Sequence, residues 1–106
     1  MTDRELMILA AKGAGLELWP GAPWRDPGSG RQGLLLANGH SMWNPLASDG
    51  DALRLAVKLD MLNENPKFLW HLAGEMTPGT DQYAATRRAI VCAAAEIGKQ
   101  LASEKS

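Results

Sequence analysis

The chain has 106 residues, of which 45% are hydrophobic and 22% are charged, and its formal net charge is −1. This length fits a single domain with one modest core. The nearly neutral charge gives no general attraction to nucleic acid or to anionic lipid, although a local basic patch is compatible with it. The single cysteine, Cys92, excludes an intrachain disulfide, and its alanine and aliphatic neighbours predict a buried, unreactive thiol.

The start of the chain is polar, with Asp3, Arg4 and Glu5 in succession, and it is unlike a signal peptide. No apolar run approaches the roughly 18 residues that a membrane-spanning helix needs. We therefore expect a cytoplasmic protein that makes no association with a membrane.

A first helix is predicted over residues 2–13. Thr2 and Glu5 have the spacing of a capping box, in which the hydroxyl and the carboxylate bond free amides at a helix start. One apolar face then repeats at helical spacing, at Leu6, Leu9, Ala10 and Gly13. Gly13 and Gly15 are expected to end the helix.

Two short strands are predicted next, over residues 16–19 and 34–37. The first alternates apolar and polar residues, and the second is apolar throughout. Residues 20–33, between them, hold three prolines and four glycines, which predicts a long loop. Asn38 and Gly39 form a strong turn signal after the second strand.

A second helix is predicted to begin at a cap formed by Ser48 or Asp49. Its apolar side is predicted to consist of Leu53, Ala56, Val57 and Leu59. Arg54 and Lys58 lie one turn apart on its polar side. Pro66 is expected to stop whatever remains of this helix.

A third strand is predicted over residues 67–72, followed by a turn at residues 77–79. Thr80 or Asp81 is expected to open a last helix that runs to about Ala102. Its buried stripe is predicted to hold Thr86, Ile90, Ala93, Ala94, Ile97 and Leu101.

Gly98 lies inside this last helix, where glycine costs about 1 kcal/mol relative to alanine. A close approach of the helix to the sheet would account for it.

The predicted element order is α-β-β-α-β-α. It gives an α+β fold in which three helices cover a small sheet of about three strands, as a helix–sheet–helix sandwich. We expect one domain over residues 1–102 and a frayed tail over residues 103–106.

Two long motifs resemble the phage ABA sandwich domain family, small proteins of tailed-phage and prophage genomes. One covers residues 43–59, which begin Trp-Asn-Pro-Leu and continue as Asp-Gly-Asp-Ala-Leu-Arg-Leu-Ala-Val-Lys-Leu. The other covers residues 85–98, which begin Ala-Thr-Arg-Arg-Ala-Ile-Val. The opening helix is similar as well, whereas residues 20–33 and 60–78 differ from the family. The resemblance implies a phage origin and a helix–sheet–helix fold, and it implies no established activity.

Arg87 and Arg88 are unusual because they lie in the first two turns of a predicted helix, where the macrodipole disfavours cations. One interpretation is structural, with the fork of Arg87 bonding a carboxylate of Asp49 or Asp51, or carbonyls at a helix end. The other is functional, with an arginine presented to an acidic partner or a phosphate.

No catalytic or metal site is predicted. Asp49, Gly50 and Asp51 are expected to cap a helix, because a calcium loop needs more oxygen ligands over a longer span. His40 and His71 have neither ligand spacing nor the partners of a catalytic triad. We therefore expect no enzymatic activity, no cofactor and no bound metal.

Two tryptophans stand out. Trp43 is predicted to be a core residue, with Asn44 bonding local backbone, against the alternative of a binding pocket. Trp24 lies beside Arg25 in the proline- and glycine-rich loop, and both residue types are frequent in interface hot spots. The open alternatives for Trp24 are packing back onto the fold and contact with a partner.

Together these features predict a small non-enzymatic phage or prophage protein that binds a host protein or complex in the cytoplasm of its bacterial host, to redirect it or to block a defence system. One alternative is nucleic-acid association through a shared cationic face. Another is a minor structural or regulatory component of the phage particle. The candidate partner-binding residues are Trp24, Arg25, Arg54, Lys58, Arg87 and Arg88.

Overall fold

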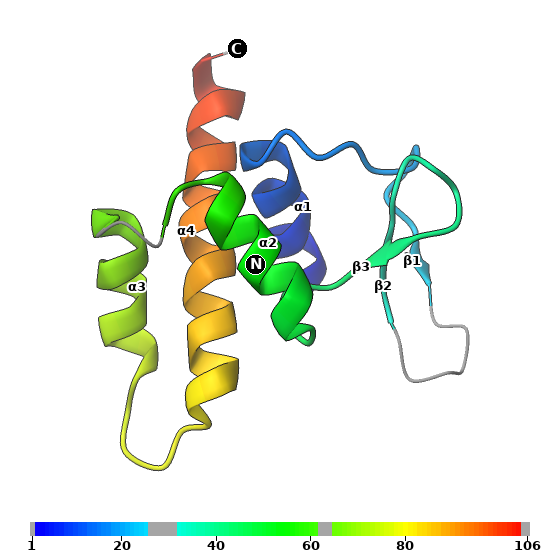
Figure 1. The fold of residues 1–106 in the computed structure, drawn as a ribbon. Helices are drawn as coiled ribbons and strands as arrows, with labels where there is room; N and C mark the ends of the chain where they lie inside the picture. Colours follow the sequence, from blue (N-terminus) through cyan, green and yellow to red (C-terminus); the bar gives the residue numbers. More distant parts are fainter. Residues whose placement is uncertain (1, 26–31, 62–64, 105–106) are drawn as a thin grey trace.

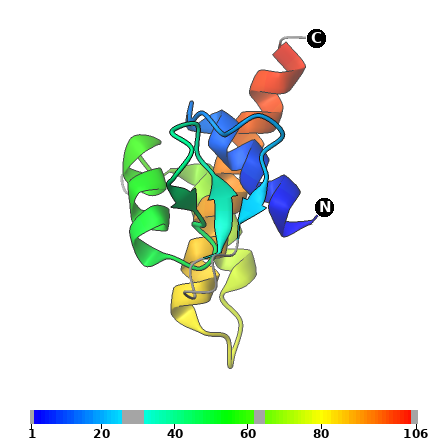
Figure 2. The same cartoon turned by 90° about the vertical axis from the view of Figure 1, so that its right-hand side faces the viewer.

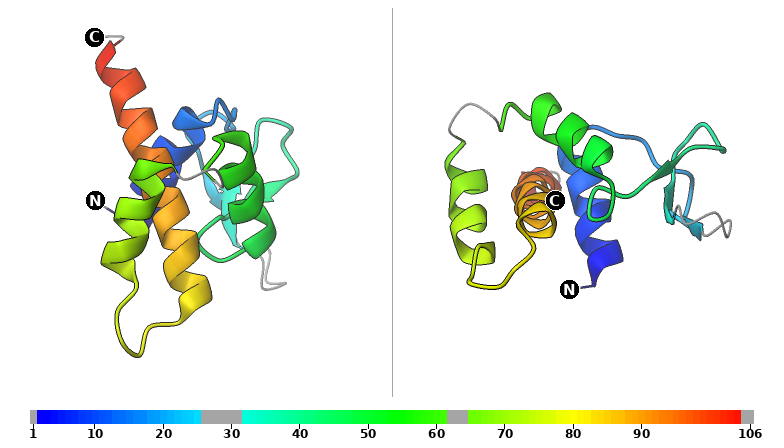
Figure 3. Two further views of the ribbon diagram at one scale, coloured as in Figure 1. Left: turned by 60° about the vertical axis from the view of Figure 1, so that its left-hand side comes forward. Right: turned by 60° about the horizontal axis from the view of Figure 1, so that its bottom comes forward.

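The fold is organised around one long helix, α4 (Gln82–Glu104), with three shorter helices packed against it (Figure 1). The computed structural model describes residues 2–25, 32–61 and 65–104. The shorter helices are α1 (Asp3–Gly13), α2 (Asp49–Lys58) and α3 (Pro66–Glu75). Seen along its axis, α4 lies between α1 and α3, with α2 along a third side (Figure 3).

Because it has neighbours on three sides, α4 is buried over most of its circumference. Its buried residues are Ala85, Ala89, Ile90, Val91, Ala93, Ala94 and Ala95. The predicted buried stripe of this helix is therefore too narrow. Leu101, which the prediction placed in the stripe, is 36% exposed.

The start of α1 follows the predicted capping box. The Thr2 hydroxyl accepts a hydrogen bond of 3.1 Å from the backbone amide of Glu5. The helix ends at Gly13, and Gly15 then takes a positive φ of 68°, which lets the chain turn away. Both ends of this helix are thus set by the residues that the sequence pattern singled out.

The α1 and α4 backbones touch where two glycines meet. A Cβ atom at Gly98 would lie 1.9 Å from the carbonyl oxygen of Leu9, and one at Gly13 would lie 2.4 Å from that of Ala94. No side chain fits at either position. The close approach that Gly98 permits is therefore to another helix, and the expected approach to the sheet is wrong.

The sheet has three short antiparallel strands in the order β1-β2-β3, and Figure 2 views it face on with the helices behind it. The strands are β1 (Trp24–Arg25), β2 (Gly33–Leu35) and β3 (Met42–Trp43). Leu34 of the central strand pairs with Trp24 of β1 on one side and with Trp43 of β3 on the other. Leu34 is fully buried in the main core, which joins the sheet to the helices.

Two strand predictions need correction. Residues 16–19 form only an isolated bridge, between Leu18 and Leu36, instead of a strand. The loop predicted over residues 20–33 contains β1, while its residues 26–31 lie outside the described residues. The turn after β2 is as predicted, because the Asn38 side chain accepts hydrogen bonds from the backbone amides of His40 and Ser41.

α3 replaces the third strand that was predicted over residues 67–72. The Asn65 side chain caps it by accepting hydrogen bonds from the amides of Lys67 and Phe68. Pro66 is its first residue, where the missing N–H costs nothing and the fixed φ favours a helix. Pro66 therefore starts a helix, and the prediction that it stops one is wrong, since α2 ends at Lys58.

α4 begins where the sequence predicts, because the Asp81 carboxylate accepts a hydrogen bond of 2.9 Å from the amide of Tyr83. It runs to Glu104, two residues into the predicted tail, and residues 105–106 lie outside the described part. The predicted α+β fold with a three-stranded sheet is confirmed, with four helices in the described part of the chain. Within residues 2–25, 32–61 and 65–104, no helix combines the length and apolar content needed to cross a membrane.

Candidate functional site

Two hollows flank α2, and together they include most of the residues of functional interest. The sheet-side pocket has a volume of about 570 Å³ and is lined by Ala14, Leu16, Leu36, His40, Ser41, Met42, Trp43, Asp51, Arg54, Leu55 and Lys58. The helix groove has a volume of about 430 Å³ and is lined by Asp49, Ala52, Leu53, Ala56, Phe68, Tyr83, Thr86, Arg87 and Ile90. α2 separates the two, so its opposite sides face different surroundings.

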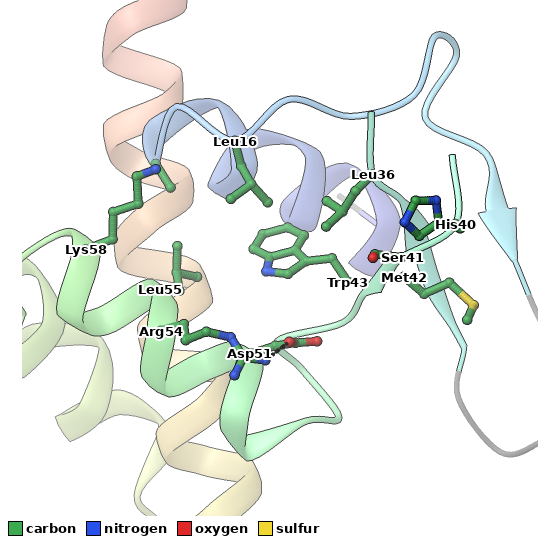
Figure 4. A pocket seen from close by; sticks show the side chains of 11 residues that line it. Leu16, Leu36, His40, Ser41, Met42, Trp43, Asp51, Arg54, Leu55 and Lys58 are labelled. Carbon is green, nitrogen blue, oxygen red and sulfur yellow. Dashed lines mark hydrogen bonds and ion pairs between the residues drawn. The ribbon is translucent and has the colours of Figure 1, made fainter. Parts of the chain in front are cut away.

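The centre of the sheet-side pocket is the Trp43 ring (Figure 4). β3 places Trp43 between the sheet and α2, where the residue is 6% exposed. Leu16 and Leu36 lie on one side of the ring and Leu55 of α2 on the other (Figure 4). The prediction that Trp43 is a core residue is confirmed, and its ring also forms a wall of the pocket.

Charged groups of α2 form the other side of this pocket. Asp51 is buried, and its Oδ1 accepts a hydrogen bond of 2.6 Å from Arg54, whose side chain is 73% exposed. Its Oδ2 accepts one of 2.9 Å from the backbone amide of Asn44. Lys58 lies one helical turn beyond Arg54 and makes no ion pair with a described residue.

The acidic pair at the start of α2 has structural partners, as predicted. The Ser48 hydroxyl accepts a hydrogen bond of 3.2 Å from the amide of Asp51, which caps the helix. Asn44 was expected to bond local backbone, and its side chain instead donates to the distant carbonyl of Gln32. Among the described residues, no three His, Cys, Asp or Glu side chains come together as a metal site would require.

The helix groove is walled by α2 and α3 and floored by α4. Its apolar lining includes Leu53 from α2, Phe68 from α3, and Tyr83 and Ile90 from α4. Leu53 is 55% exposed and Tyr83 is 72% exposed. Val57 follows Leu53 by one turn on α2 and is 60% exposed, so it extends this apolar surface along the helix.

Arg87 lies beside the groove and fixes the start of α2 to α4. Its Nε donates a hydrogen bond of 2.8 Å to the carbonyl of Leu46, and its Nη1 lies 2.6 Å from Oδ1 of Asp49. The side chain is only 17% exposed. The structural interpretation of Arg87, with Asp49 as its partner, is therefore confirmed.

Arg88 is held in a different place. Its Nη1 donates to Oδ1 of Asp3 at 3.2 Å, and its Nε lies 3.6 Å from Glu75. The hydrogen bond to Asp3 raises the pKa of the Arg88 guanidinium, an effect that partial burial opposes. The predicted cations are thus not gathered on one face. Arg54 and Lys58 line the sheet-side pocket and the other two arginines are on α4, and each of the three arginines has a carboxylate partner.

Trp24 and Arg25 form β1, at the edge of the sheet and away from the helix groove (Figure 1). Both are exposed, and Trp24 has 40% of its surface accessible. Trp24 therefore does not pack fully onto the fold. Of the other candidate partner-binding residues, only its neighbour Arg25 lies beside it.

Sequence reasoning missed the groove residues. It placed Leu53 and Val57 on the buried side of their helix, but the buried apolar residues there are Ala52, Leu55 and Ala56. A signal was available, because Leu53 and Leu55 lie about 200° apart around a helix and cannot share one face. Tyr83 was not singled out, and Phe68 was assigned to the predicted strand.

No family model matches the chain, and neither a curated protein nor a solved structure matches it. The resemblance to the phage ABA sandwich domain family therefore stays a prediction from the two sequence motifs.

Proposed function

We propose that this chain is a small non-enzymatic phage or prophage accessory protein that binds a host protein or complex. The observation that carries the proposal is the exposed apolar surface of the helix groove, formed by Leu53, Val57 and Tyr83. Burying large apolar side chains stabilises a folded domain, so a domain this small gains nothing from leaving three of them exposed on adjoining helices. Such a surface is typical of a protein-interaction site.

The shape of the groove favours one kind of contact. Its two walls are helices and its floor is a third helix, so a partner helix can lay an apolar face between α2 and α3. Leu53 and Tyr83 would then lose their contact with water, as central residues of an interface do. The Arg87–Asp49 pair would hold the wall of the groove in place.

The nucleic-acid alternative receives less support from this arrangement. It needs several cations on one face, and three of the four candidates, Arg54, Arg87 and Arg88, are engaged by carboxylates. A binding titration over a range of salt concentrations tests it, because phosphate contacts give a steep loss of affinity with salt. The role of a minor particle component would use the same groove, and detection in purified virions would distinguish it.

The proposal is tested by affinity capture from host cells with three tagged forms: the wild type, Leu53→Glu and Leu101→Glu. Leu101 is an exposed leucine near the far end of α4, so it receives the same substitution away from the groove. We expect the wild type and Leu101→Glu to retain one stoichiometric protein that Leu53→Glu loses. A partner retained equally by all three forms, or only background proteins, would contradict the proposal.

A further inference from the structure

The sheet-side pocket has the size of a small-molecule site. Its volume of about 570 Å³ falls within the range of roughly 300–1,000 Å³ that ligand pockets span. Such pockets are mostly apolar and contain a few polar groups that orient the ligand. The sheet-side pocket has both features, on opposite sides.

The apolar side is formed by Leu16, Leu36 and the Trp43 ring (Figure 4). These residues come from the segment after α1, from the position that directly follows β2 and from β3, and the bridge between Leu18 and Leu36 ties the first two segments together. The side is therefore built from paired backbone, and a flat apolar group can lie against it without rearrangement.

The opposite side has an excess of positive charge. Arg54 and Lys58 are both in the lining, but in Figure 4 the Lys58 side chain extends toward the segment that follows α1, whereas the Arg54 guanidinium turns toward Asp51. Asp51 is the one carboxylate in the lining, and both of its oxygens accept hydrogen bonds, from Arg54 and from the Asn44 amide. Its charge is compensated, whereas the Lys58 ammonium has no carboxylate partner in the described part of the chain.

A neutral donor completes this side. In Figure 4 the ring nitrogen of Trp43 lies on the edge of the ring nearer α2. No described residue accepts a hydrogen bond from it, although the tryptophan is only 6% exposed. The nitrogen itself is reached by solvent, so a ligand acceptor can replace water on this donor.

We propose that the sheet-side pocket binds a small organic anion with a flat apolar body, such as an aromatic carboxylate. The apolar body lies against Leu16, Leu36 and Trp43, and the carboxylate faces Lys58, the cation of the lining that has no carboxylate partner among the described residues. One free ammonium matches one carboxylate, whereas a nucleoside triphosphate would need more donors. This inference is independent of the groove, which is on the other side of α2.

The test is a titration of ¹⁵N-labelled protein with 1-naphthoate and with its neutral counterpart 1-naphthamide, observed at the tryptophan indole signals. The Trp43 signal is assigned with Trp43→Phe. We expect it to shift on binding, and we expect 1-naphthoate to bind roughly fivefold or more tightly than 1-naphthamide, because only the acid interacts with the Lys58 ammonium. Lys58→Gln should remove most of this preference.

Lys99→Gln is the matched control, since Lys99 is an exposed lysine of α4 outside the pocket. It should leave both affinities unchanged, and an unperturbed amide spectrum checks the fold of each variant. Equal binding of acid and amide would overturn the inference. So would a Trp43 signal that stays in place while other signals shift, or a preference that survives Lys58→Gln.

Discussion

At the scale of single residues, Arg87 shows how one side chain joins segments that are far apart in the sequence. It bonds the Leu46 carbonyl and the Asp49 carboxylate, 41 and 38 residues earlier. Its planar fork can reach both at once, which the single ammonium of lysine would do less well. Arg88, the next residue, is more exposed and makes longer contacts.

Removing these two side chains should therefore have unequal effects. We expect Arg87→Ala to lower the free energy of unfolding by about 1–3 kcal/mol, because it leaves the partly buried Leu46 carbonyl without its donor. Arg88→Ala should cost less than about 1 kcal/mol, as exposed ion pairs do. Urea unfolding of both variants measures the difference, and equal losses would show that Arg87 does not fix α2 to α4.

The thiol of Cys92 gives a second prediction at this scale. Burial raises its pKa above the usual value, against a smaller opposing effect of Arg88. Less thiolate is then present at any given pH, so iodoacetamide should alkylate the folded protein more slowly than free cysteine at pH 8. The unfolded chain loses this proton at lower pH, so the free energy of unfolding should also fall as the pH rises above the ordinary thiol value.

Mass spectrometry of the alkylated protein over time measures the rate, with Cys92→Ala as the unlabelled control. A rate equal to that of free cysteine would mean that the thiol is more accessible than its place on α4 implies.

At the scale of elements, helix ends were predictable and the segment before α4 was not. Thr2, Ser48 and Asp81 act at helix starts as their sequence patterns indicate. Residues 67–72 were assigned to a strand because the short apolar run has no long-range pattern that separates strand from helix. The decisive signal was local, since asparagine followed by proline is a good helix start as well as a stop for a preceding helix.

The contact between α1 and α4 predicts that alanine has opposite effects at a glycine inside this contact and at a glycine outside it. At Gly98 an added Cβ would overlap the Leu9 carbonyl, whereas at Gly74 in α3 it would meet nothing within 4 Å. Gly98→Ala should lower the free energy of unfolding by about 3 kcal/mol or more, because the helices must move apart. Gly74→Ala should raise it by roughly 0.5–1 kcal/mol, since alanine favours a helix.

Thermal unfolding of the two variants compares these effects directly. A Gly98→Ala protein as stable as the wild type would place α1 farther from α4 than the structure has it.

At the scale of the whole molecule, the site was less predictable than the fold. The spacing in the sequence identified Arg54 and Lys58 as neighbours on α2, but only the tertiary structure brings them into one pocket with Trp43. The helix groove was missed for a related reason. It joins residues of three helices, one of which was predicted as a strand, so the groove could not be inferred from α2 alone, although the spacing of Leu53 and Leu55 indicates that only one of them faces the core.

The central claim is that the helix groove is the surface that binds a partner. The most direct measurement is a calorimetric titration of the purified captured partner into the wild type, Leu53→Glu and Trp24→Ala. We predict that Leu53→Glu weakens binding at least tenfold, by about 1.4 kcal/mol or more, because a carboxylate would be buried against apolar side chains. Trp24→Ala, at the edge of the sheet, should bind as the wild type does. Full affinity of Leu53→Glu together with loss of binding by Trp24→Ala would contradict the claim and move the interface to the sheet edge.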